Sequence, residues 1–157
     1  MIALREHHAQ TAMDYGQLIY GTSDLRAQQK DTFFFALCRY MQDLKIGNNK
    51  LSKITGIPKS TISRYRNGTR KPCFDYLAAI CIALRLQTCR QRHLFAVSKM
   101  LMPDERSHCN ERDYIVREFL DSCPYDKRFS VCACNARLRA IGEYPLTLLM
   151  DSMEEQR

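Results

Sequence analysis

The sequence predicts an all-α fold with a small helical extension at its C-terminal end. From residue 31 onward, apolar residues recur three or four positions apart in most segments, which is the spacing of one face of an α-helix. Glycine, proline and asparagine stand between these segments, where helices begin and end. With 45% hydrophobic and 26% charged residues, the composition is that of a folded chain and excludes wholesale disorder.

Residues 1–30 carry the weakest pattern. Their apolar residues have loose helical spacing, interrupted by Gly16 and Gly21, which predicts an N-terminal arm or one weak helix. The start of the chain lacks the apolar stretch of a secretory signal, and no run approaches the roughly 18 apolar residues that span a membrane. We therefore expect a cytoplasmic protein that makes no contact with a membrane.

The first well-defined helix is expected to begin at Asp31 or Thr32 and to run through Leu44. Its apolar stripe consists of positions 33, 34, 37, 41 and 44. Three consecutive phenylalanines overfill one stripe, so we expect one of them to meet something outside this module. Core packing is favoured over an aromatic cofactor site. Asn48 or Asn49 is the expected N-cap of the next helix.

The pattern of residues 51–68 predicts two short helices joined by a tight turn. Gly56 supplies the conformational freedom that the turn needs. Pro58 suits the start of the second helix, because the first turn of a helix has no acceptor for the N–H that proline lacks. Asn67-Gly68 ends this helix, since both residues tolerate a left-handed backbone.

The second of these helices has two different faces. Ile62 and Tyr65, three positions apart, are expected to point inward. The residues expected to point outward can all form hydrogen bonds, and they are Ser60, Thr61, Ser63 and Arg64. A short helix with an apolar back and a front of small polar residues and arginine fits the major groove of DNA.

Two more helices are expected in the module, residues 74–84 with Cys73 as the cap, and residues 90–102, ended by Pro103. Leu77, Ile80, Cys81 and Leu84 form the inner face of the former. Ile82 lies off that face, which indicates that this helix is covered on two sides.

Residues 103–157 form the expected extension, after a polar hinge. One helix is predicted over 110–121, and its inward residues are Tyr114, Ile115, Phe119 and Leu120. A second helix is predicted from the cap Ser130 through Ile141, with Gly142 as its stop. The inward residues of the second helix are Val131, Cys134, Leu138 and Ile141. Two small helices bury little surface alone, so we expect them to pack on helices 74–84 and 90–102 or across a dimer interface.

Positive charge is concentrated on one segment. Residues 45–71 contain eight Lys and Arg and no Asp or Glu, whereas the whole chain has a net charge of +7, so the rest sums to −1. Residues 101–157 carry 8 basic and 11 acidic side chains. A solvated helical face normally mixes charges, because like charges destabilise it. The eight cations therefore favour a nucleic-acid phosphate backbone as the partner of this segment.

Residues 51–72 also resemble a known motif, the helix-turn-helix of the lambda-repressor-like (XRE) family. The pattern is Leu-Ala-x-x-x-Gly-hydrophobic-Ser-x-x-Thr-Ile-Ser-x-hydrophobic-x-x-Gly-x-x-x-Pro. The chain departs from it at Ser52, where the family has Ala, and at Pro58, where it has a capping Ser or Thr. It matches at Leu51, Gly56, Ile57, Thr61, Ile62, Ser63, Tyr65, Gly68 and Pro72.

The resemblance covers about residues 33–86 and implies a five-helix lambda-repressor-like DNA-binding module, which we place at residues 31–102. It implies sequence-specific binding to double-stranded DNA, usually as a homodimer, and transcriptional regulation as the consequence. By analogy, four residues face base edges: Lys59, Ser60, Thr61 and Arg64. Six residues hold phosphates: Asn48, Asn49, Lys50, Asn67, Arg70 and Lys71.

An interaction protein, antitoxin-like or accessory to a mobile element, is the alternative function. Its helical tail would bind a protein partner, and the apolar excess at Phe33–Phe35 and Ile82 supports it. An enzyme is not expected, because neither an acidic metal cluster nor a positioned nucleophile is visible.

The eight cysteines do not change this reading. The spacing Cys132-x-Cys134 places two thiols on different sides of a helix, and no Cys-x-x-Cys occurs, so neither a metal nor a cofactor is expected. Cys38 and Cys81 stand at apolar positions and are interpreted as small buried side chains.

Overall fold

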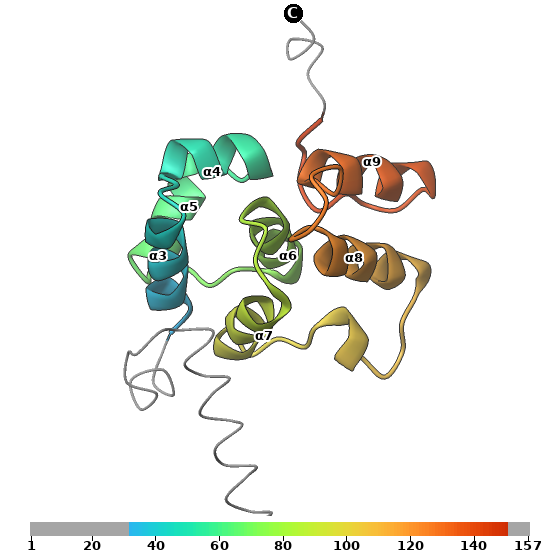
Figure 1. Ribbon diagram of the computed structural model, residues 1–157, viewed down its shortest axis with the longest axis horizontal. Helices are drawn as coiled ribbons and strands as arrows, with labels where there is room; N and C mark the ends of the chain where they lie inside the picture. The colour runs from blue at the N-terminus through green and yellow to red at the C-terminus, as the bar shows by residue number, and fades with distance from the viewer. Residues whose placement is uncertain (1–31, 151–157) are drawn as a thin grey trace, which may run out of the picture. The chain divides into compact units, whose positions relative to one another are not determined.

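The computed structural model describes residues 32–150 (Figure 1), so the expected N-terminal arm, residues 1–30, lies outside the described residues. This part of the chain contains seven α-helices, one 3-10 helix and no strand, which confirms the all-α prediction. The helices are α3 (Phe33–Asp43), α4 (Asn48–Thr55), α5 (Lys59–Arg66), α6 (Phe74–Ala83), α7 (Thr88–Val97), η1 (Pro103–Glu105), α8 (Glu111–Ser122) and α9 (Val131–Ala140). Each described helix is too short or too polar to cross a membrane.

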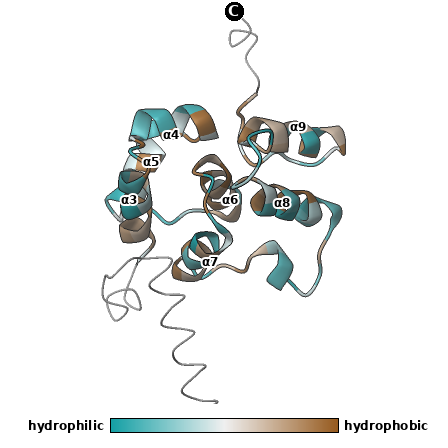
Figure 2. Ribbon diagram, in the orientation of Figure 1, coloured by the Kyte–Doolittle hydropathy of each residue, from teal (hydrophilic) through white to brown (hydrophobic). Residues whose placement is uncertain are grey.

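Helix α6 lies at the centre of the core. Its residues from Leu77 to Ile82 are fully buried, and α4, α7, α8 and α9 all pack against it. Figure 2 shows the consequence, since α6 is apolar around most of its circumference. The prediction that Ile82 indicates coverage on two sides is confirmed, and α8 and α9 are part of that cover.

The three phenylalanines at the start of α3 have three different environments. The ring of Phe33 packs edge-on against that of Tyr65, with centroids 5.7 Å apart. Phe34 lies beside Gly68, where an added Cβ would come within 3.1 Å of its ring. Phe35 is 59% exposed, so the expectation that one of the three meets something outside this module stays a prediction. Leu44, expected inside, is instead exposed, because the helix ends before it.

Two predicted helix boundaries were wrong. The N-cap of α4 is Gly47, not Asn48 or Asn49, which already have helical backbone. Helix α7 covers residues 88–97 instead of 90–102, because Lys99 takes a left-handed backbone with φ of 55°. The N–H of Met100 then bonds back to the carbonyl of Phe95 and closes the helix end.

Both helices of the extension form, and each begins with a side-chain cap. Asn110 accepts a hydrogen bond from the N–H of Asp113 at the start of α8, and Ser130 accepts one from the N–H of Ala133 at the start of α9. Gly142, with φ of 77°, follows the end of α9 as predicted.

The inner face of α8 is rotated from the predicted one. Val116 is fully buried, whereas Tyr114, expected inside, is 61% exposed. Ile141, also expected inside, caps the end of α9 and is exposed. The packing of both helices on α6, and of α8 on α7, confirms the predicted contact with the module.

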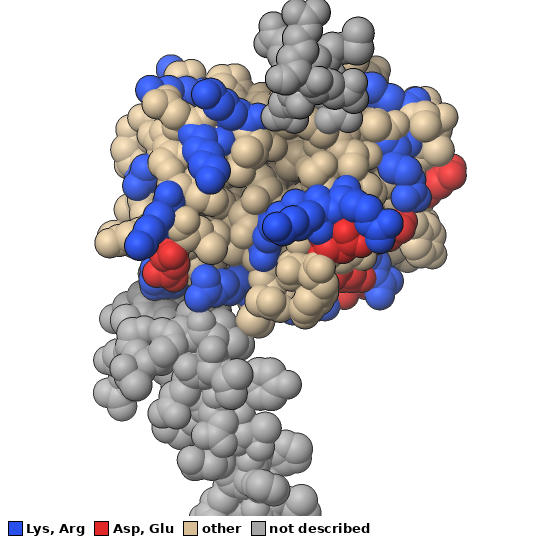
Figure 3. All heavy atoms as spheres, turned by 45° about the horizontal axis from the view of Figure 1, so that its top comes forward, with Lys and Arg blue, Asp and Glu red and all other residues tan. Residues whose placement is uncertain are grey.

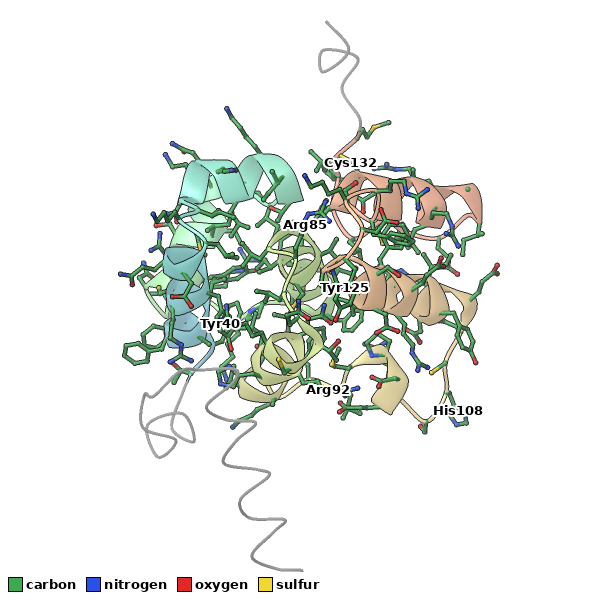
Figure 4. All side chains as sticks on the ribbon, viewed as in Figure 1. Tyr40, Arg85, Arg92, His108, Tyr125 and Cys132 are labelled. Atoms are coloured by element: carbon green, nitrogen blue, oxygen red, sulfur yellow. The ribbon has the colours of Figure 1, made fainter. Side chains whose placement is uncertain are left out.

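Arg85 joins the end of α6 to the end of α8. Its guanidinium donates to the carbonyls of Cys123, Asp126 and Lys127 at 2.9, 3.1 and 2.9 Å. Beside it, the hydroxyl of Tyr125 donates to the side chain of Gln87 at 3.0 Å, and Figure 4 labels Arg85 and Tyr125. The bonds of Arg85 tie the segment that follows α6 to the C-cap of α8 and to the loop after it.

Candidate nucleic-acid interface

The turn between α4 and α5 is closed by short-range hydrogen bonds. Gly56 has φ of 79°, which other residues rarely adopt. The hydroxyl of Thr55 donates to the carbonyl of Leu51 at 2.6 Å and accepts from the N–H of Ile57 at 3.1 Å. The hydroxyl of Ser52 donates to the carbonyl of Ile57 at 2.7 Å. The departure from Ala at position 52 thus adds a hydrogen bond to this turn.

Helix α5 is fixed by its apolar side. Ile62 and Tyr65 are buried as predicted, and burial raises the pKa of the Tyr65 phenol to about 12, so it stays neutral. The opposite side is exposed and consists of Lys59, Ser60, Ser63 and Arg64.

Thr61 does not belong to this exposed side. The prediction that it points outward was wrong, because its side chain is only 6% exposed. Thr61 stands four positions before Tyr65, and this spacing places both residues on the same side of a helix. Ser63 has the exposure that was expected of Thr61 and is a residue that the base-facing set omitted.

The loop after α5 is held by Asn67 and Gly68. The side-chain oxygen of Asn67 accepts from the N–H and the hydroxyl of Thr69, at 3.1 and 2.7 Å. Gly68 takes the left-handed backbone expected there, with φ of 78°. Arg66 donates to the side-chain oxygen of Asn48 at 2.7 Å and thereby ties the end of α5 to the start of α4. Asn48 and Asn67 therefore retain only their amide NH2 groups for a phosphate.

The other predicted phosphate-contacting residues are exposed: Asn49, Lys50, Arg70 and Lys71. The charges of Lys50, Arg70 and Lys71 are also without an ion-pair partner in the described part of the chain. Every ion pair between residues 32–150 lies outside residues 45–71, whereas seven arginines elsewhere in this range pair with Asp or Glu. Figure 3 shows the same contrast, with mostly Lys and Arg over α3 to α5 on the left and mixed charges over α8 and α9 on the right.

Residues 36–88 match the family model of the Cro/C1-type HTH DNA-binding domain. The chain contains a Cro/C1-type helix-turn-helix domain. This confirms the resemblance to lambda-repressor-like proteins and accounts for α3 to α6, with α4 and α5 as the helix-turn-helix. Neither a curated protein nor a solved structure shows significant similarity to the chain. The Cro/C1-type domain makes this a DNA-binding protein.

The thiols lie both inside and outside the core. Cys81 is buried as predicted, whereas Cys38 is half-buried and its thiol donates to the carbonyl of Arg66 at 3.6 Å. Within residues 32–150, no three His, Cys, Asp or Glu side chains come close enough to hold a metal ion.

Proposed function

We propose that the protein is a sequence-specific transcriptional regulator that binds double-stranded DNA and reads the major groove with α5. The observation that carries this proposal is the set of eight exposed or half-exposed cations between residues 45 and 71, which make no ion pair within the described part of the chain. Unpaired cations around a short helix with a polar outer side match the phosphates that flank a groove.

Within α5, we assign base contacts to Lys59, Ser60 and Arg64, with Ser63 in place of Thr61. Arg64 is the strongest candidate, because it is exposed and an arginine can donate two hydrogen bonds to one guanine. Phosphate contacts are assigned to Asn48, Asn49, Lys50, Asn67, Arg70 and Lys71. The side-chain oxygens of Asn48 and Asn67 already accept hydrogen bonds within the protein, so these two residues would donate to a phosphate through their NH2 groups.

A homodimer on two half-sites one helical turn apart is the proposed assembly, because a domain of this kind covers only one such half-site. Regulation of transcription follows from occupancy of a specific site in DNA. The interaction-protein alternative loses one of its two supports, since Ile82 is fully buried by the chain itself.

The proposal is tested by selecting the sequences that the protein binds from random duplex DNA. The affinities of Arg64→Ala and Lys53→Ala for the enriched sequence are then measured. Arg64→Ala is expected to weaken specific binding by about 1–3 kcal/mol and to relax the preference at one base pair. Lys53→Ala removes the same charge from an exposed position on α4, and it is expected to weaken binding to specific and unrelated DNA alike.

A palindromic enriched sequence would support the dimer. Failure to enrich any sequence, with binding that only weakens steeply with salt, would contradict specific reading by α5. Equal effects of the two substitutions on every duplex would contradict the role of Arg64.

A further inference from the structure

The chain that follows α9 returns to the helix-turn-helix. We name residues 146–149 the C-terminal strap. An added Cβ on Gly56 would stand 2.7 Å from Cβ of Leu149 and 3.0 Å from both the backbone nitrogen of Leu149 and Oγ1 of Thr147. The strap thus lies in direct contact with the Gly56 turn, and α9 packs against α4. Figure 1 shows the end of α4 beside the segment that leaves α9.

One buried side chain holds the strap in this place. The side-chain oxygen of Asn135 in α9 accepts from the N–H groups of Leu146 and Thr147, at 2.9 and 3.3 Å. Its NH2 group donates to the hydroxyl of Thr147 and to the carbonyl of Leu149, both at 3.0 Å. Asn135 is 0% exposed and uses its full hydrogen-bonding capacity on the strap.

Because Asn135 and Thr147 are buried, their hydrogen bonds can affect DNA binding only indirectly. Asn135 and Thr147 are 0% and 4% exposed, so neither side chain can reach DNA. The turn that the strap covers is followed within three residues by Lys59, the first residue of α5. Any effect of Asn135 on DNA binding must therefore pass through the position of the turn and of α5.

We propose that the C-terminal strap positions the helix-turn-helix for DNA reading, with Asn135 as the positioning residue. The extension is then part of the DNA-binding unit and not an independent appendage. This inference rests on the proposed function, and its consequence is specific: loosening the strap lowers discrimination between DNA sequences while the basic surface and its attraction to phosphates stay intact.

The test compares Asn135→Ala and Thr147→Val with Thr147→Ser, which keeps the hydroxyl, and with Gln91→Ala. Gln91 is an equally buried amide whose NH2 donates to the carbonyl of Leu86, just before α7, and to that of Leu120 in α8. These bonds hold α7 against α8 and the preceding loop instead of holding the turn. Amide hydrogen exchange of Gly56, Ile57 and Ile62 in the free protein is the first measurement. The ratio of affinities for selected and scrambled duplexes, with its salt dependence, is the second.

Asn135→Ala and Thr147→Val are expected to speed exchange at the turn and to lower the affinity ratio by about tenfold, with an unchanged salt slope. Thr147→Ser and Gln91→Ala should leave both readouts near those of the parent protein. Thr147→Val decides the matter if Asn135→Ala does not fold.

Unchanged exchange at the turn overturns the inference whatever happens with DNA. Faster exchange with an unchanged affinity ratio, or an equal loss in Gln91→Ala, overturns the role in DNA reading. A parent protein that prefers no duplex contradicts the proposed function instead, and the exchange data then still show whether the strap restrains the turn.

Discussion

Ser52 shows how one residue can replace a family preference. Its hydroxyl donates to the carbonyl of Ile57 across the turn, where the family pattern has Ala. A hydrogen bond of this kind contributes about 0.5–1.5 kcal/mol, and removing one partner leaves the other without a bond when it is shielded from water. The side chain of Ser52 is half-buried, so water reaches this site only in part.

We expect Ser52→Ala to destabilise the protein by about 1 kcal/mol, although Ala is the residue that the family prefers there. Denaturant unfolding of the two proteins measures the difference. Ser60→Ala, on the exposed side of α5, is the matched control and should leave the stability within about 0.5 kcal/mol. A neutral or stabilising Ser52→Ala would show that the hydrogen bond adds nothing to the turn.

At the scale of elements, the helices differ in how their first N–H groups are satisfied. Asn110 and Ser130 cap α8 and α9 through their side chains, whereas the N-cap of α4 is a glycine without a side chain. Gly47 has an extended backbone, with φ of −90° and ψ of 176°, and an added Cβ there meets nothing within 4 Å. Position 47 therefore accepts a capping residue without strain.

Gly47→Ser is expected to stabilise the protein by about 0.5–1 kcal/mol, through a new cap and a less flexible unfolded chain. Thermal or denaturant unfolding gives the value. Gly56→Ser is the control at the other end of the same helix, and it should destabilise clearly, since Gly56 has a left-handed backbone and is covered by the strap. If both substitutions shift stability in the same direction, the assignment of the α4 cap is wrong.

At the scale of the whole molecule, the core contains groups that must stay neutral. Burial raises the pKa of the thiols of Cys123 and Cys134 to about 12, and Cys81 shifts in the same direction. Tyr65 also titrates at about 12. In the unfolded chain the thiols ionise near 9 and the phenol near 10. Because the folded pKa values are the higher ones, these groups favour the folded state fully below pH 9 and lose that contribution as the pH rises toward 12.

The free energy of unfolding should therefore fall between pH 9 and pH 10.5. Urea unfolding at several pH values measures the slope, with Cys134→Ala expected to make it shallower. Cys109→Ala removes an exposed thiol and should leave the slope unchanged. A stability that stays constant to pH 10.5, or equal slopes in the two variants, would contradict the role of the buried thiols.

Local patterns in the sequence were sufficient for the helices of the domain and for most of the exposed side of α5. The spacing of apolar residues predicts which side of a helix is buried. For α5, Ile62 and Tyr65 predict the buried side within two turns. Gly56 and Gly68 mark positions where only a left-handed backbone continues the chain, and both have it. These are short-range effects, and they need no knowledge of the neighbouring elements.

Apolar periodicity and the positions of glycine predict the class of fold, the helix-turn-helix and most of the exposed side of α5. The tertiary structure decided what covers each element. Thr61 is polar, which predicts an outward side chain, yet its environment depends on packing beside Tyr65. Asn135 has no apolar pattern around it that points to the strap, and Leu149 and Gly56 are far apart in the chain. Contacts of this kind arise only when α9 packs against α4, because a buried polar residue finds its partners through the whole fold and not through its neighbours in sequence.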